Sequence, residues 1–235
     1  MSQNPVVSSV AESLVPFTGY YTLDAGPGAF LLVDTNYLYA LVDGTPVITY
    51  KATITFSLNG TSSAVFDADT CCTFDNGNLT VAYDGITAAQ VYLFKDTANG
   101  NVSSLTGTVE GTAVTGSTPF NPIEMQVFAA EYFEPVDGGY QGRLTLNPDY
   151  SVWFREGSGD FVQVTEYFYN YAMFVIGFTL NGETNTFEMG TTSASGRVAG
   201  NSAKAGLFVS ITSSNVYPPV GQTVAKAAAA EPVAA

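Results

Sequence analysis

The amino-acid sequence predicts an all-β fold, an antiparallel β-barrel or sandwich built from an internal duplication, with flexible N- and C-terminal arms. Three observations favour this fold class. Apolar and polar residues alternate, with frequent turn signals, between residues 17 and 217. No segment combines a helical period with helix caps. Short segments also recur in the same order in both halves of the chain, which is typical of a duplicated unit.

Three pairs of matched segments predict the duplication. Residues 56–60 (FSLNG) return as residues 178–182 (FTLNG), and residues 107–111 (GTVEG) return as residues 196–200 (GRVAG). A weaker third pair matches three residues of each half: Leu31, Val33 and Tyr37 with Leu144, Leu146 and Tyr150. We therefore expect four parts, which are an N-terminal arm at 1–16, a first β repeat at 17–123 with an insertion at about 68–100, a second β repeat at 124–217 and a disordered Ala/Pro-rich tail at 218–235.

The individual strands follow in order from alternation and from the turn residues that separate them. The expected strands are 18–24, 28–34, 36–42, 46–58, 62–67, 78–84, 89–95, 104–110, 126–134, 139–147, 150–155, 161–180, 184–189, 195–200 and 205–212. Asn59-Gly60 and Asn181-Gly182 supply the pair of positive φ angles that a type I′ hairpin needs, so we expect a tight hairpin at each.

Composition and charge exclude several classes of function. The 235 residues include 46% hydrophobic and 13% aromatic residues, enough for a sizeable core, and only 12% charged residues. The net charge of -14 would repel a phosphate backbone, so no nucleic-acid partner is expected, and the few Lys and Arg residues also disfavour an anionic membrane surface. No apolar run reaches the roughly 18 residues of a transmembrane segment, and residues 1–10 do not resemble a signal peptide. We therefore expect a soluble protein that is not classically exported, located in the cytoplasm or in a compartment that the sequence does not identify.

Metal, cofactor and disulfide chemistry have little support in the sequence. Cys71 and Cys72 are adjacent and cannot close a long loop, and with no histidine they are expected to be two partly buried thiols and not metal ligands. Asp67, Asp69 and Asp75 could offer oxygen ligands to calcium, but their spacing is not that of an EF-hand and favours a turn. We expect no metal site and no cofactor.

Catalysis has few candidate groups. The absence of histidine removes His-based triads and the commonest general base near neutral pH. Glu156, Asp160 and Glu166 lie close in sequence to Trp153 and Tyr167, where an aromatic pocket could raise a carboxyl pKa. Their spacing matches no catalytic motif, so they are read as exposed loop and strand charges and the catalytic residues stay unassigned.

The two expected long strands differ on their outer faces. Around 46–58, Ile48 to Leu58 in steps of two form an apolar face, and the opposite face, from Val47 to Ser57, is mostly polar. Around 161–180 the outer face carries large side chains, and Trp153 and Arg155 on a neighbouring strand could join it. The resulting candidate ligand-binding residues are Trp153, Arg155, Tyr167, Tyr169, Tyr171 and Met173.

These observations predict a β-barrel protein that binds a hydrophobic or aromatic small molecule without redox or metal chemistry. Two alternatives remain open. The Tyr-rich face could be a subunit interface of a structural or assembly protein, with a homo-oligomer as the result. The chain could also be a cofactor-free cyclase or isomerase, which would need an apolar cavity with Glu156, Asp160 or Glu166 pointing inward.

Overall fold

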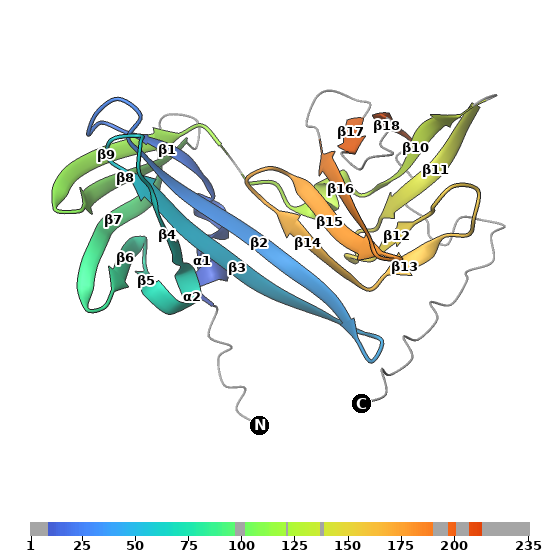
Figure 1. The fold of residues 1–235 in the computed structure, drawn as a ribbon, viewed down its shortest axis with the longest axis horizontal. Helices are drawn as coiled ribbons and strands as arrows, with labels where there is room; N and C mark the ends of the chain where they lie inside the picture. Colours follow the sequence, from blue (N-terminus) through green and yellow to red (C-terminus); the bar gives the residue numbers. More distant parts are fainter. Residues whose placement is uncertain are drawn as a thin grey trace. The chain divides into compact units, whose positions relative to one another are not determined.

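The protein is all-β, as predicted, in a computed structural model that describes residues 9–96, 102–120, 122–136, 139–189, 197–200 and 207–212. The chain divides into two compact units (Figure 1). Unit 1 comprises 1–38, 48–123 and 170–173, and unit 2 comprises 39–47, 124–169 and 174–235. Segments 39–47 and 170–173 each belong to the unit other than that of the residues on both sides of them in the chain. The sequence did not predict this assignment. None of the described helices is long and apolar enough to cross a bilayer.

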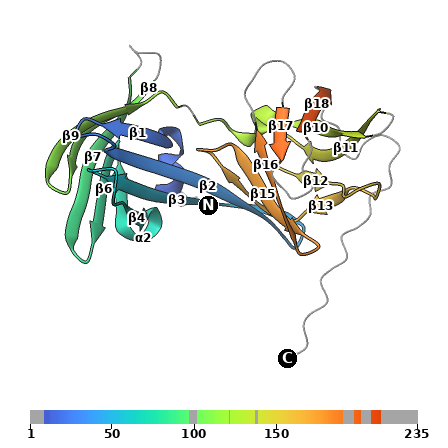
Figure 2. The same ribbon diagram turned by 45° about the horizontal axis from the view of Figure 1, so that its top comes forward.

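Unit 1 is an antiparallel meander whose last strand pairs with its first, since β1 pairs with both β2 and β9 (Figure 2). Strands β2 and β3 continue into the short segment 39–47 of unit 2. The elements are α1 (Val10–Leu14), η1 (Val15–Phe17), β1 (Gly19–Leu23), β2 (Phe30–Val42), β3 (Thr45–Ser57), β4 (Ala64–Asp67), α2 (Ala68–Cys71), β5 (Cys72–Asp75), β6 (Asn78–Tyr83), β7 (Ile86–Asp96), β8 (Val102–Val109) and β9 (Thr112–Thr118).

Unit 2 has the same general plan, because its last described strand, β18, pairs with its first, β10. The elements are η3 (Met125–Phe128), β10 (Ala130–Val136), β11 (Gly139–Leu146), β12 (Val152–Phe154), β13 (Val162–Val164), β14 (Glu166–Asn170), β15 (Val175–Leu180), β16 (Glu183–Met189), β17 (Arg197–Gly200) and β18 (Leu207–Thr212). The tail predicted at 218–235 lies outside the described residues, as do residues 1–8.

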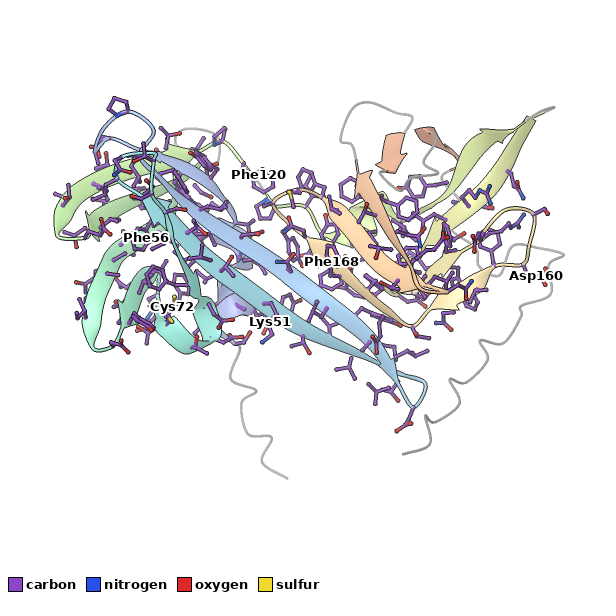
Figure 3. All side chains as sticks on the ribbon, viewed as in Figure 1. Lys51, Phe56, Cys72, Phe120, Asp160 and Phe168 are labelled. Atoms are coloured by element: carbon purple, nitrogen blue, oxygen red, sulfur yellow. The ribbon has the colours of Figure 1, made fainter. Side chains whose placement is uncertain are left out.

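The core of unit 1 is filled by side chains from one face of its strands and from helix α1. Leu31, Ile54 and Leu79 are fully buried, and Figure 3 shows Phe56 and Cys72 within the same unit. The apolar face predicted for 46–58 is confirmed, because Ala52, Ile54 and Phe56 are buried. The interior of unit 1 is therefore occupied by its own side chains.

The N-terminal arm predicted at 1–16 is wrong for its described part. Residues 10–17 form α1 and η1, and the side chains of Ala11 and Leu14 are completely buried. The Ser9 hydroxyl caps α1 by accepting a hydrogen bond from the amide of Glu12 at 3.1 Å. Five helical residues are too few for a helical period to be visible in the sequence.

The two Asn-Gly pairs adopt different turns. Asn181 and Gly182 have φ angles of 52° and 77° and join paired residues Leu180 and Glu183, which confirms the type I′ hairpin there. At Asn59-Gly60 the prediction is wrong, because only Gly60 has a positive φ and the last paired residues, Phe56 and Ala64, lie much further apart in the chain. The Asn59 side chain instead accepts hydrogen bonds from the amides of residues 61 and 62.

The segment at 68–100, predicted as an insertion, contributes α2 and strands β5 to β7 to the sheet of unit 1. Asn76-Gly77 forms the turn between β5 and β6, with φ angles of 48° and 87°. Strand β5 and strand β9 were both missed by the sequence reading, because each is short or rich in Gly, Ser and Thr.

Candidate functional site

The long strand predicted at 161–180 is interrupted twice. Strands β13, β14 and β15 occupy parts of it, and a turn covers residues 171–174, where Phe174 has a φ of 53°. Alternation therefore does not run through the whole segment, and the predicted outer stripe is not one face. Tyr167, Tyr169 and Tyr171 are between 0% and 4% exposed, so the prediction that they lie on an outer face is wrong.

In unit 2, Tyr167 and Tyr169 are core side chains. The ring of Tyr167 stacks on that of Tyr39, with centroids 4.8 Å apart, and its hydroxyl donates to the carbonyl of Tyr150 at 2.6 Å. Burial raises the pKa of Tyr169, and the charge of Glu124 adds to the effect. The phenol of Tyr169 therefore stays neutral inside unit 2.

In unit 1, Tyr171 and Met173 point to different environments. Tyr171 is 1% exposed and meets the ring of Tyr37 edge-on, with centroids 5.9 Å apart. Met173 is 60% exposed. Of the four predicted residues on the interrupted strand, Met173 alone presents its side chain to solvent.

Trp153 and Arg155 lie in unit 2. Trp153 on β12 pairs with Thr145 and Gln163, and its neighbours Val152 and Phe154 are buried. The guanidinium carbon of Arg155 lies 4.2 Å from the centroid of the Phe161 ring. Ligand binding by these two residues and by the four above stays a prediction.

The acidic residues considered for catalysis or for metal binding have other surroundings. Glu156, Asp160 and Glu166 are exposed, and Figure 3 shows Asp160 in the loop after β12. Asp67 caps α2 by accepting from the amide of Thr70 at 3.1 Å, and Asp69 pairs with Lys51 at 3.4 Å. Within the described residues no group of three or more Cys, Asp or Glu side chains could hold a metal ion.

The two cysteines are free thiols, and Cys72 is the more buried. Burial raises the pKa of Cys72 to about 12, and the neighbouring Cys71, Asp67 and Asp69 reinforce this direction. A thiol with so high a pKa is a poor nucleophile near neutral pH.

A groove of about 280 Å³ opens on the outer face of unit 1, on β1 and β2. The side chains that line it are mainly apolar or aromatic, with one carboxylate. The lining residues are Gly19, Tyr20, Leu32, Asp34, Thr118, Phe120, Ala172 and Met173. Figure 3 labels Phe120 just beyond the end of β9.

The floor of the groove comes from the β1–β2 hairpin. Tyr20 pairs with Leu32, and their neighbours Tyr21 and Leu31 point into the core, so period-two alternation turns Tyr20 and Leu32 outward. The ring of Tyr20, which is 51% exposed, stacks on that of Phe30 with centroids 5.0 Å apart. This stacking gives the groove a rigid aromatic wall.

Gly19 allows a second wall of the groove, formed by Thr118 and Phe120, to lie close to β1. A Cβ at Gly19, where φ is 150°, would lie 2.9 Å from a methyl carbon of Thr118 and 3.3 Å from the Cβ of Phe120. The Thr118 hydroxyl accepts a hydrogen bond from the amide of Phe120 at 3.3 Å. The missing side chain therefore allows the end of β9 to close over β1.

Asn170 joins the remaining wall to the floor. Its side-chain amide donates to Oδ1 of Asp34 at 2.8 Å and to Oδ1 of Asn36 at 2.9 Å, and its own Oδ1 accepts from the amide of Met173 at 2.7 Å. Asn170 is 3% exposed. The buried Asn170 side chain is thus hydrogen-bonded both to Asp34, the carboxylate of the groove, and to the backbone of Met173, the thioether residue of the groove.

Asp34 is the polar group of the groove. Burial raises the pKa of Asp34, and the hydrogen bond from Asn170 opposes this effect in part. Oδ2 of Asp34 receives no hydrogen bond from any protein group that the structure describes. This oxygen can therefore accept a hydrogen bond from a bound molecule, or donate one to it when protonated.

Most groove residues were missed by the sequence reading, which selected Met173 but not Tyr20, Leu32, Asp34 or Phe120. A signal was present in the run of residues 30–33 (FLLV), which is apolar on both faces of a strand. A strand with one solvated face needs apolar residues at only every second position. The additional apolar residues on the outer face of this run, Phe30 and Leu32, lie at the groove.

Comparison of the chain with protein-family models, curated proteins and solved structures found no match.

Proposed function

We propose that the protein binds a small hydrophobic or aromatic molecule in the groove on β1 and β2. The observation that carries the proposal is the combination of outward-facing Tyr20, Leu32, Phe120 and Met173 with one half-buried carboxylate. Ligand pockets in proteins are typically apolar and contain a few polar groups that fix the orientation of the ligand.

The volume and the polar group limit the ligand. About 280 Å³ is just below the roughly 300–1,000 Å³ of typical pockets, which suits a molecule of up to three aromatic rings or a short acyl chain. Asp34 would hold a hydroxyl, amine or amide group at one end of it. A negative net charge of -14 disfavours an anionic ligand.

The two alternatives from the sequence receive less support. The subunit interface was based on Tyr167, Tyr169 and Tyr171, which are buried in their own units. The cyclase or isomerase needed Glu156, Asp160 or Glu166 to point inward, and all three are exposed. Ligand binding in the groove uses side chains that are accessible.

A neutral fluorescent probe, N-phenyl-1-naphthylamine, tests the proposal with the full chain. We expect its emission to rise on binding and its affinity to fall at least tenfold in the Leu32→Asp and Phe120→Ala variants, because each removes apolar contact area. Backbone amide shifts at Gly19, Leu32 and Ala172 should move with the probe concentration.

Val65→Ala is the matched control, since Val65 is 65% exposed on β4 and does not line the groove. The proposal is overturned if the probe does not bind, or if Leu32→Asp and Val65→Ala bind it equally well. Circular dichroism and thermal unfolding establish that each variant is folded.

A further inference from the structure

The outer face of strands β5 to β9 carries a second candidate site of different chemistry. Cross-strand register places exposed or half-exposed polar side chains of successive strands in rows. One row runs from Asn78 through Tyr92 and Thr106 to Thr115, and the next runs from Phe94 through Ser104 and Ser117 to Thr22. Most of these side chains are neutral hydrogen-bonding groups, mainly hydroxyls.

A cleft of about 590 Å³ lies over the part of this face where β7, β8, β9 and β1 are neighbours. Its lining combines hydroxyl groups with one aromatic ring and one carboxylate. It includes Thr106, Thr115, Ser104, Ser117, Phe94 and Asp24. Among the described residues the hydroxyls of Ser104, Thr106 and Ser117 make no side-chain hydrogen bond to another protein group, so they are available to a ligand.

Tyr92 provides an exposed ring at the edge of the cleft. The ring is 45% exposed and stacks on that of Phe94, with centroids 5.7 Å apart and planes 20° apart. A Cβ at Gly77 would lie 2.7 Å from the ring, so the turn between β5 and β6 also confines it. An exposed ring that is already held in place loses little conformational entropy when a ligand stacks on it.

Asp24 ends the cleft on the side of β1. Its two carboxylate oxygens accept hydrogen bonds from the amide of Thr115 at 2.7 Å and from the hydroxyl of Thr115 at 2.8 Å. These hydrogen bonds lower the pKa of Asp24. The ionised carboxylate keeps further lone pairs that can accept from the hydroxyls of a ligand.

We infer that this face binds a neutral oligosaccharide. Sugars offer an apolar C–H face for stacking on Tyr92 and many hydroxyls that both donate to and accept from Ser and Thr side chains. Tyr92 and Thr115 are two strand spacings apart, about 10 Å, which is close to the length of a disaccharide. Asp24 and the net charge of -14 select against acidic sugars.

The inference is independent of the groove on β1 and β2, and its experiment is separate. The full chain is run in native gels that contain a neutral β-glucan, an α-glucan or a galactomannan, with polygalacturonate as the anionic comparison. We expect at least one neutral polymer to retard the protein. The dissociation constant for that polymer should be at least tenfold larger in Tyr92→Ala and several-fold larger in Thr106→Val.

Tyr83→Ala is the matched control, because Tyr83 is 61% exposed at the end of β6 and pairs with Ile86, which does not line the cleft, whereas Tyr92 pairs with the lining residue Thr106. Phe120→Ala should also retain binding, which separates this site from the groove. The inference fails if no neutral polymer retards the protein, if polygalacturonate retards it as strongly, or if Tyr92→Ala and Tyr83→Ala behave alike. It also fails if Tyr92→Ala changes only the molar mass measured by light scattering, which would assign the face to a second copy of the chain.

Discussion

The first hairpins of the two units share their inner side chains and differ in their outer ones. In unit 1, η1 is followed by β1, and Tyr21 donates a hydrogen bond from its hydroxyl to the carbonyl of Phe17. In unit 2, η3 is followed by β10, and Tyr132 makes the equivalent bond to the carbonyl of Phe128. The register also agrees, because Tyr21 pairs with Leu31 and Tyr132 pairs with Leu144.

The outward-facing positions of the same hairpins are not alike. The pair Tyr20 and Leu32, which forms the groove floor, corresponds by register to Glu131 and Thr145. Two residues further along, Asp34 corresponds to Asn147. Burial raises the pKa of Glu131, and the charge of Arg155 opposes this. The inner face thus serves the fold in both units, and at this outer pair only unit 1 has large apolar side chains.

This correspondence supports the internal duplication, which stays a prediction. Leu31 and Val33 lie opposite Tyr21 and Gly19, and Leu144 and Leu146 lie opposite Tyr132 and Ala130 in the same order. The third matched residue behaves differently in the two units, since Tyr37 is buried within β2 and Tyr150 lies in a turn with a φ of 67°.

The largest effect is expected from truncating the shared inner positions. Leu31→Ala and Leu144→Ala should each lower the free energy of unfolding by about 2–5 kcal/mol, because both leucines are fully buried and each change leaves a cavity. Urea unfolding followed by circular dichroism measures both losses, and hydrogen exchange identifies the unit that opens. The comparison breaks if one variant loses several kcal/mol and the other loses less than about 1 kcal/mol.

A second pair of corresponding positions tests the turns. A Cβ at Gly182 (φ 77°) would meet no atom within 4 Å. Gly182→Ala should therefore lower the free energy of unfolding only by the strain of a left-handed backbone conformation, about 1 kcal/mol. Gly60→Ala should cost roughly 1 kcal/mol more, because its Cβ would also lie 3.0 Å from the carbonyl oxygen of Gly28. Equal losses in thermal unfolding would contradict this difference between two identical dipeptides.

The turns also show how far local sequence can predict this fold. Alternation identified most strands and the inner face of β3, because period two follows from backbone geometry alone. The dipeptide Asn-Gly permits a type I′ turn but does not impose one, and at Asn59 side-chain hydrogen bonds to the following amides stabilise a wider loop. Tertiary contact between Gly28 and Gly60 supports that loop and is not visible locally.

The candidate site was harder to predict than the fold. The stripe from Tyr167 to Met173 required an unbroken strand, and the turn at 171–174 depends on hydrogen bonds from Asn170 to residues far away in the sequence. Tyr20, Leu32 and Phe120 meet only because β1 pairs with both β2 and β9. Long-range pairing of this kind leaves no local signal, except the excess of apolar residues at 30–33.

Exchanging the outer pair between the units tests whether the groove depends on Tyr20 and Leu32. Tyr20→Glu combined with Leu32→Thr gives unit 1 the outer residues of unit 2, and we expect at least tenfold weaker binding of N-phenyl-1-naphthylamine, about 1.4 kcal/mol. Thermal unfolding should change little, because both side chains lie outside the core. Thr49→Glu on the exposed face of β3 is the control for added charge, and equal binding by both variants would contradict the comparison.

The smallest effect is expected from Asp34→Asn, which gives unit 1 the residue that unit 2 has at the corresponding position, Asn147. Because burial raises the folded-state pKa of Asp34, the wild type loses stability as pH rises from the usual value of about 3.8 through that higher pKa. Asp34→Asn does not titrate and can still accept the hydrogen bond from Asn170. Its melting temperature relative to the wild type should therefore increase between pH 3 and pH 7. Asp84→Asn, at an exposed position in the turn after β6, is the control for removing one negative charge from unit 1. If the difference at Asp34 falls as pH rises, the carboxylate is stabilised in the folded state, and the groove has a fixed negative charge and not a neutral polar group.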